Sequence, residues 1–378
     1  MRVLFWTELF WPVIGGAEIF SSKLVCSLRH RGHEVIVVTR KDSPDLPAEE
    51  EYKGIPVYRF PFAKALIDRN LDEVMTLRQQ VSDLKRKFGP ELVHLHQCGP
   101  SSWFHFETVK AYRTRLIVTL IVEIVEQVGS TELLRHAMIS ADWVTCKTAT
   151  MLAEASRLAP EISSRSSIIH NGIDIPVLAP TRLPLVNPRI LCLGRLDSQK
   201  GFDLAVEAWP FIVARFPDAR LVIAGDGPER LTLERRIAAL NLSQTVRLIG
   251  WVAPDSVPSL MNSATIVAMP SRWEGFPSVG LQAAAMARPI VASRVGGLPD
   301  IVADRQTGFT VEAEDAGALG KAIITLLESP ELAVEMGKAG RHRVQKLFGW
   351  EQCVDRYDAL YRQVANGIVA NSHSRSPG

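Results

Sequence analysis

The 378-residue sequence has few features of a secreted, membrane-spanning or nucleic-acid-binding protein. Its five cysteines are scattered and form no close pairs of the kind found in metal sites, which favours a reducing, cytoplasmic setting. No apolar run is long enough to cross a bilayer, and residues 1–6 are too short an apolar run for a signal peptide. A formal charge of +2 is too small to indicate a nucleic-acid partner.

The chain is long, and short apolar runs alternate along it with helix-length segments. Its length predicts two domains, and 47% hydrophobic with 22% charged residues is an ordinary globular composition. The alternation begins with a predicted strand at 2–6, a glycine turn, a helix at 17–31 and a strand at 34–39. It is typical of α/β proteins with a doubly wound parallel sheet. We assign residues 1–175 to the first domain.

A change of composition separates this domain from a second one. Residues 176–188 hold four prolines and show no helical period, so we predict a linker there. The strand–helix alternation then restarts and predicts a second parallel-sheet domain over 189–349. Residues 350–365 are predicted to form a helix, with Tyr357 and Tyr361 on one packed face. The tail, 366–378, is small and polar, and we expect it to be disordered.

One loop, 271–282, combines an acid with the start of a helix. It follows a predicted buried strand and carries Glu274 and then Pro277, which suits the first helical turn. The N–H groups of Ser278 and Val279 would then be free at a helix start, where an anion is favoured. This combination indicates a site that holds a phosphate and a hydroxyl-rich group side by side.

Other predicted strands also end in loops that suit anions. Gly15 and Gly16 let backbone N–H groups approach a phosphate, although a tight turn without a ligand is equally consistent. Arg195 and Lys200 could converge on one diphosphate, the first as a fork and the second as a point charge. The alternative is two solvated surface charges. A further glycine turn surrounds Asp226, which could instead simply cap a helix.

The order of these motifs along almost the whole chain resembles that of the retaining glycosyltransferases of family 4, which have the GT-B fold. The matching segments are GGAE at 15–18, RGHEV at 31–35, NGID at 171–174, GRLDSQKG at 194–201, GDGPE at 225–229, EGF at 274–276, VGGLP at 295–299 and TGF at 307–309. The resemblance implies two Rossmann-like, doubly wound parallel-sheet domains facing across a cleft, with the last helix crossing back to the first domain.

The resemblance also implies an activity. The chain would be a retaining hexosyltransferase that moves a sugar from a nucleotide-diphosphate sugar to a saccharide, lipid-linked or small-molecule acceptor, without a cofactor. Catalytic roles would fall to Glu274, which faces the donor sugar, and to Arg195 and Lys200, whose charge stabilises the leaving group. The diphosphate would be bound by Gly15, Gly16, Arg195, Lys200, Ser278 and Val279. The sequence has no Asp-x-Asp motif, so we expect no metal at the diphosphate.

Two positions depart from the family pattern. Gln282 stands where the family has a second acid that binds the ribose hydroxyls. An amide still bonds a hydroxyl but lacks the stronger charge-assisted bond, so we expect weaker or altered nucleotide recognition. Ile121 stands where many members have a histidine near the reacting sugar, and an aliphatic side chain bonds no hydroxyl.

The acceptor-side candidates are His96 and Glu123. We expect His94 and His96 to point to opposite faces of a strand, with His96 nearer its end and the substrate. The alternative for His96 is a packed histidine, and for Glu123 and its neighbour Glu126 a solvated loop acid.

The expected partners are a nucleotide sugar and its acceptor, with no nucleic acid. The basic run 85–87 could contact an anionic membrane at its inner face, or simply favour the end of its own helix. Two other functions stay open. A nucleotide-sugar epimerase-hydrolase of similar architecture would release free epimerised sugar. A catalytically weak nucleotide-sugar-binding subunit would fit Ile121 and Gln282.

Overall fold

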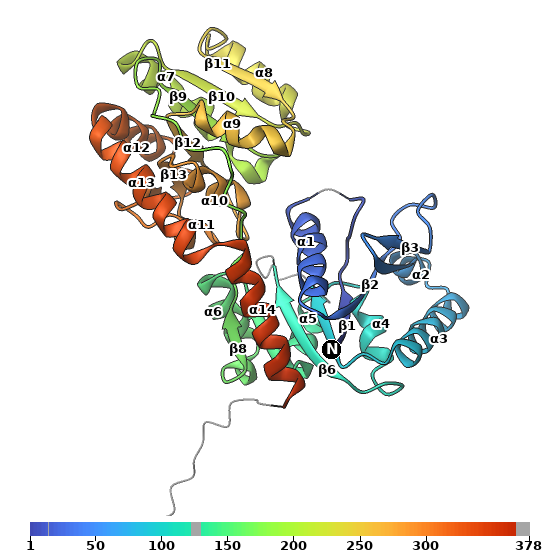
Figure 1. The fold of residues 1–378 in the computed structure, drawn as a ribbon. Coiled ribbons are helices and arrows are strands. Elements are labelled where there is room, and N and C mark those ends of the chain that lie inside the picture. The colour runs from blue at the N-terminus through green and yellow to red at the C-terminus, as the bar shows by residue number, and fades with distance from the viewer. Residues whose placement is uncertain (14, 122–129, 368–378) are drawn as a thin grey trace, which may run out of the picture. The chain divides into compact units, whose positions relative to one another are not determined.

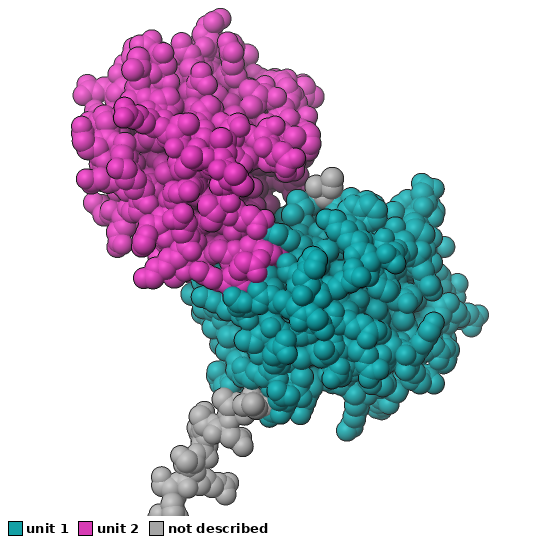
Figure 2. Space-filling model, viewed as in Figure 1, with its two compact units in different colours: residues 1–170, 353–378 teal, residues 171–352 magenta. Residues whose placement is uncertain are grey.

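The chain forms two compact units, each an α/β structure built on its own sheet. The computed structural model describes residues 1–13, 15–121 and 130–367 (Figure 1). One unit comprises residues 1–170 and 353–378, and the other comprises residues 171–352 (Figure 2).

The first unit has an eight-stranded sheet in the order β3-β4-β2-β1-β5-β6-β7-β8. All neighbours pair in parallel except β3, which runs antiparallel to β4 at the edge. The strands are β1 (Arg2–Trp6), β2 (Glu34–Arg40), β3 (Glu49–Tyr52), β4 (Ile55–Phe60), β5 (Leu92–His96), β6 (Arg115–Leu120), β7 (Trp143–Cys146) and β8 (Ser166–Ile168). The helices are α1 (Gly16–His30), α2 (Phe62–Ile67), α3 (Leu71–Phe88), α4 (Ser102–Glu107), α5 (Ser130–Ser140), α6 (Ala149–Leu158) and α14 (Trp350–Ala365).

The second unit has a six-stranded, wholly parallel sheet in the order β11-β10-β9-β12-β13-β14. Its strands are β9 (Arg189–Leu193), β10 (Arg220–Ala224), β11 (Val246–Gly250), β12 (Ile266–Met269), β13 (Ile290–Ser293) and β14 (Gly308–Val311). Its helices are α7 (Phe202–Arg215), α8 (Arg230–Ala239), α9 (Val257–Asn262), α10 (Ser278–Ala285), α11 (Leu298–Ile301), α12 (Ala316–Glu328) and α13 (Pro330–Leu347). The predicted fold class of two doubly wound parallel sheets is confirmed.

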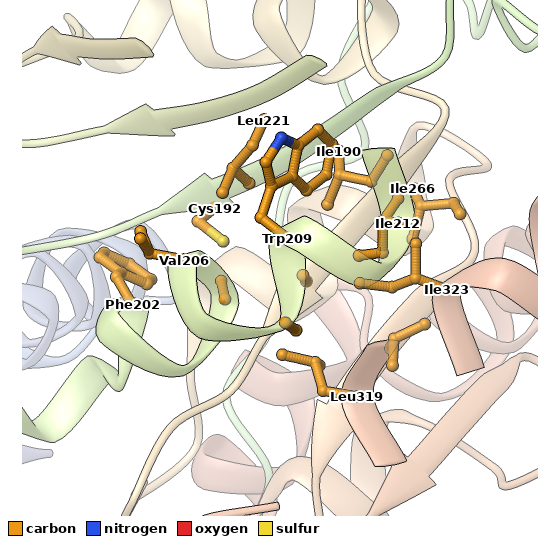
Figure 3. Packing of buried hydrophobic residues seen from close by; sticks show 14 of the residues in the cluster. Ile190, Cys192, Phe202, Val206, Trp209, Ile212, Leu221, Ile266, Leu319 and Ile323 are labelled. Atoms are coloured by element: carbon orange, nitrogen blue, oxygen red, sulfur yellow. The ribbon is translucent and has the colours of Figure 1, made fainter. Parts of the chain in front are cut away.

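Alternate residues of β9 show how the second sheet is covered on both faces. Ile190 and Cys192 belong to a buried cluster with Trp209 of α7 and Leu319 of α12 (Figure 3). Leu191, between them, belongs to a separate cluster with α10. Because successive side chains of a strand point to opposite faces, a strand buried on both sides is apolar throughout.

Helix α14 packs on the first unit, as the resemblance to family 4 implied (Figure 1). Tyr357 and Tyr361 are both buried in it, as the sequence predicted. Lys147 Nζ donates a hydrogen bond of 2.8 Å to the Tyr357 hydroxyl. The Tyr361 hydroxyl lies at hydrogen-bond distance from Nδ1 of His94, whose Nε2 meets Thr119 Oγ1 at 2.6 Å. The helix is therefore held by a buried polar network as well as by apolar contact.

The prediction that His94 and His96 point to opposite faces is wrong. Both rings pack against Phe5, and their centroids lie 5.5 Å apart. The reason is the two-residue period of a strand: residues i and i+2, such as His94 and His96, lie on the same face.

The basic run 85–87 is not a continuous charged surface. Lys85 is fully buried, and its ammonium donates to the His105 carbonyl at 3.1 Å and to Thr108 Oγ1 at 2.8 Å. Burial lowers the pKa of Lys85 to about 7, because the enclosed site disfavours the charged ammonium. Arg86 and Lys87 are exposed, so only these two side chains of the run could meet a membrane.

We expect Lys85→Met to flatten the pH dependence of the first unit's stability. The pKa of Lys85 is about 7 in the folded chain, against an ordinary 10.5. Between these values the unfolded chain binds more protons, so the free energy of unfolding rises with pH, by at most about 1.4 kcal/mol per pH unit. The burial cost is largest below the folded pKa and vanishes above the unfolded one. Urea unfolding at about pH 6.5, 8 and 9.5, followed by tryptophan fluorescence, measures the slope.

Lys87→Met is the matched control, since it removes an exposed lysine two positions away. It should keep the wild-type slope. Part of the slope should persist in Lys85→Met, because burial also lowers the pKa of Lys147, to about 8. Identical slopes in wild type and Lys85→Met would contradict the prediction.

Candidate active site

Three loops of the second unit meet at the carboxyl-terminal ends of the strands of its sheet. They follow β9, β10 and β12, which are neighbours in the order β10-β9-β12. Adjacent parallel strands end at the same edge, where open α/β sheets bind ligands. Backbone bonds join the loops: Leu196 N donates to Asp226 O at 2.9 Å, and Arg272 N donates to Gln199 O at 2.8 Å.

Two glycines let these loops approach each other. A Cβ on Gly225, whose φ is 138°, would lie 1.8 Å from the Gly194 carbonyl oxygen. A Cβ on Gly201, at φ 60°, would lie 2.1 Å from the Pro270 carbonyl oxygen. Only glycine fits such positions. Asp226 accepts from Gly227 N at 2.8 Å instead of capping α8, which has no side-chain cap, so the capping interpretation of Asp226 is wrong.

The structure brings Lys200 and Glu274 together. Lys200 Nζ lies 2.7 Å from Glu274 Oε1, and Ser271 Oγ donates to the same oxygen at 2.7 Å. The acid is 4% exposed and the serine 2%. A buried carboxylate needs a compensating charge and donors, and this site supplies both.

Arg195 contacts a different carboxylate. Its Nε bonds Asp197 Oδ2, and its side chain is 70% exposed. Asp197 also caps the short turn at Ser198–Lys200 by accepting from Lys200 N at 3.3 Å. The two predicted diphosphate cations thus lie in one loop but do not share a partner in this structure.

Helix α10 begins beside Glu274, as the sequence predicted, but one residue later than expected. Pro277 is its N-cap and not part of its first turn, and no side chain caps the helix start. Ser278 is exposed there, and Val279 is half-buried. Gln282 is half-buried and lies one turn beyond Ser278 on the same side of the helix.

Arg272 is a site residue that the sequence interpretation missed. Its guanidinium binds both Asp203 oxygens, at 2.9 and 2.8 Å, and also Glu314 and the Ser198 carbonyl. The bonds to Asp203 are the main cause that raises the pKa of Arg272 above its ordinary value. This residue anchors the loop that carries Ser271 and Glu274. No local pattern signals the role, because Asp203 is 69 residues away in the sequence.

In the first unit, Gly15 and Gly16 lie at the start of α1. Gly15 is the N-cap in an extended conformation, and no side chain caps the helix. A Cβ on Gly15 would lie 2.2 Å from Glu18 Oε2, whereas Gly16 has open space around it. The backbone N–H groups at this helix start are uncapped by side chains, as anion binding would require. Anion binding here stays a prediction.

His96 sits in a packed position. It is 1% exposed, stacks on Phe20, and bonds Ser21 Oγ through Nδ1 at 3.0 Å. Burial lowers its pKa well below the ordinary value, so the ring is neutral. Its Nε2 is buried and has no hydrogen-bond partner among the described residues. The geometry fits the packed alternative, and a substrate role stays a prediction.

The other acceptor-side candidates, Glu123 and Glu126, lie outside the described residues. Ile121 is described and half-buried, directly after β6.

Glu8 lies just after the carboxyl end of β1 in the first unit. The sequence interpretation missed it as well. It is 5% exposed, and its Oε1 accepts from Ser101 N at 2.8 Å. Burial raises the pKa of this carboxyl group. The sequence did contain a signal for Glu8, which is an acidic residue just after a buried strand. Its second oxygen, Oε2, has no partner among the described residues.

The described part of the chain has neither a cluster of metal ligands nor a membrane-spanning helix. There, no three His, Cys, Asp or Glu side chains come together as a metal ion would need. Between residues 1 and 367, outside the two undescribed segments, no helix combines the length and the apolar character that crossing a bilayer requires.

Comparison with known proteins gives two family matches that follow each other along the chain. Residues 14–176 match the model described as Glycosyltransferase Family 4. Residues 179–343 match the model described as Glycosyl transferases group 1. The boundary between the two matches falls close to that between the two compact units.

Individual relatives align over nearly the whole chain. An uncharacterized glycosyltransferase of Methanocaldococcus jannaschii is 25% identical, over 97% of this chain and 99% of its own. The glycogen synthase of Mycobacterium tuberculosis is 26% identical, over 97% of this chain and 96% of its own. The solved sucrose-phosphate synthase of Thermosynechococcus elongatus superposes with a TM-score of 0.81 at 24% identity, over 97% of this chain and 100% of that one.

We expect Arg272→Leu to lower the free energy of unfolding of the second unit by about 1–3 kcal/mol, because it leaves Asp203 without its bidentate partner. Arg294→Leu is the control: Arg294 is 51% exposed and makes a single 3.1 Å pair with Glu312. Its loss should cost less than about 1 kcal/mol. Urea unfolding of the two full-length variants measures the difference, and equal effects would refute the anchoring role of Arg272.

Proposed function

This chain belongs to the family 4 glycosyltransferases, which have the GT-B fold and use nucleotide-sugar donors, and from that premise we propose that it is a retaining hexosyltransferase that needs no metal ion. The acceptor would be a saccharide, a lipid-linked sugar or a small molecule.

The observation that carries the proposal is the meeting of Lys200 and Glu274 beside the start of α10. The ammonium and the carboxylate are 2.7 Å apart, at a helix start without a side-chain cap. A cation and uncapped N–H groups suit a diphosphate, and a carboxylate suits sugar hydroxyls. These are the two halves of a nucleotide-sugar donor, joined by the bond that the reaction breaks.

Each residue then has a role in the transfer. The bond between the anomeric carbon and the diphosphate breaks, and its electron pair stays on the diphosphate oxygen. The acceptor oxygen bonds that carbon while its proton passes to the departing diphosphate. Lys200 and Arg195 stabilise the charge that develops on the diphosphate. The backbone N–H groups of Gly15, Gly16, Ser278 and Val279 would add to this stabilisation. Glu274 bonds sugar hydroxyls and stabilises positive charge on the ring, and Gln282 bonds the ribose.

Replacing Lys200 or Glu274 by alanine should lower turnover of the donor about 10²–10³-fold, since each removes an interaction with the transition state. The assay is release of nucleoside diphosphate from a panel of nucleotide sugars, run in EDTA because no metal is required. Lys321→Ala removes an exposed lysine of the same unit and should leave turnover unchanged. Near-normal turnover in both site variants would refute the assignment.

Gln282→Glu should tighten binding of the nucleotide by about 3–10-fold, because a carboxylate accepts a stronger bond from a ribose hydroxyl than an amide does. Calorimetry with UDP and with GDP measures the dissociation constant. Inorganic pyrophosphate, which has no ribose, is the control ligand, and its affinity should not increase. Unchanged or weaker nucleotide binding would contradict the ribose-binding role.

Two other functions give different results in the same assays. An epimerase-hydrolase would release free epimerised sugar without any acceptor. A weak nucleotide-sugar-binding subunit would bind the donor tightly and transfer it to no acceptor. Ile121, an aliphatic side chain directly after β6, is the observation that favours the second of these.

A further inference from the structure

Both hydrogen bonds to the Glu274 carboxylate end on one oxygen. Lys200 Nζ and Ser271 Oγ each lie 2.7 Å from Oε1. Within the described part of the chain, Oε2 has no hydrogen-bond partner. It is not among the fully buried atoms without a partner, so it still has access to solvent. One oxygen is therefore held by the protein, and the other is left for a ligand hydroxyl.

The two partners of Oε1 differ in how freely they can leave it. The ammonium of Lys200 stands at the end of a flexible four-carbon side chain that is 21% exposed. It carries three N–H donors and can be turned toward another acceptor. Ser271 has a side chain of one carbon and is 2% exposed. Its hydroxyl can move only by rotation about χ1, so its reach is much shorter than that of the Lys200 ammonium.

That backbone is held independently of the Lys200 side chain. The carbonyl of Pro270, before Ser271, packs against Gly201 so closely that a Cβ there would lie 2.1 Å away. Arg272, after Ser271, donates through its N–H to Gln199 O at 2.8 Å and grips Asp203 with its guanidinium. Ser271 is thus fixed on both sides.

The proposed function assigns Lys200 to a diphosphate, whereas in this structure its ammonium bonds the acid. A diphosphate carries more charge than one carboxylate and competes for the same cation. When Lys200 turns to the phosphate, Glu274 loses its charge-assisted bond or shares it. The bond from Ser271 is the one that stays.

We infer that donor binding transfers Lys200 from Glu274 to the diphosphate, and that Ser271 is the positioning residue that then keeps Glu274 aimed at the sugar. The inference rests on the proposed function of the site. It predicts different effects for a change at Glu274 and a change at Ser271. Removing the charge of Glu274 frees Lys200 and favours diphosphate binding, whereas removing the Ser271 hydroxyl leaves diphosphate binding intact and slows the transfer.

The experiment compares Ser271→Ala, Ser271→Thr and Glu274→Gln in the full chain. Calorimetry with UDP and with GDP measures diphosphate affinity, and product release from the nucleotide-sugar panel gives kcat and KM. Ser271→Ala should lower kcat about 10–100-fold, the loss expected for a hydrogen bond to a charged group. Its KM and its diphosphate Kd should stay within about twofold of wild type. Ser271→Thr, which keeps the hydroxyl, should recover most of kcat.

Glu274→Gln should bind the nucleoside diphosphate about 3–10-fold more tightly than wild type while turning over slowly. Ser259→Ala, an exposed serine on α9, is the control and should change neither quantity. Thermal melting confirms that each variant is folded before it is compared.

The outcomes separate the inference from the function beneath it. Wild-type kcat in Ser271→Ala, a parallel loss of diphosphate affinity, or equal losses in the folded alanine and threonine variants would each overturn the positioning role. Unchanged or weaker diphosphate binding in Glu274→Gln would overturn the transfer of Lys200. If instead the wild-type chain turns over no nucleotide sugar, the proposed function fails, and the affinity of Glu274→Gln still tests the Lys200 exchange.

Discussion

The candidate site exists because β9 pairs in parallel with β10 on one side and β12 on the other. Parallel pairing places the carboxyl ends of all three strands at one edge, so the loops after them must meet. The Lys200–Glu274 pair joins residues 74 positions apart and depends on this arrangement alone. So do the glycines, since Gly201 and Gly225 are needed only where two of these loops come into contact.

Burial decides what the polar groups of this protein can do. Lys85 and Lys147 are enclosed, and burial lowers the pKa of each ammonium. His94 and His96 are enclosed in the same unit and are neutral for the same reason. Glu274, by contrast, is buried beside a cation and a hydroxyl. The first group of residues holds the first unit and α14 together, and the second arrangement is the one that we propose a diphosphate rearranges.

Most of the fold could be predicted because apolar periodicity is a local signal. The strand at Arg189–Leu193 is apolar from Ile190 to Leu193, since those residues are covered on both faces, and this run was the signal for it. The strand at Glu49–Tyr52 was missed because three of its four residues are acidic and it lies at the sheet edge, where no apolar pattern is needed. The short helix at Phe62–Ile67 was missed because six residues show too little periodicity.

The sequence by itself determined the class of fold, the loops that could bind an anion, and the candidate residues Glu274, Arg195 and Lys200, because each follows from local spacing and side-chain chemistry. Gln282 became a candidate only through the resemblance to family 4. Only the tertiary structure decided how these residues pair. It placed Lys200 on Glu274, left Arg195 on Asp197, added Ser271 and Arg272, and buried Lys85. These pairings depend on contacts between segments far apart in the chain and on the exclusion of water. Neither can be inferred from the residues next to any one position in the sequence.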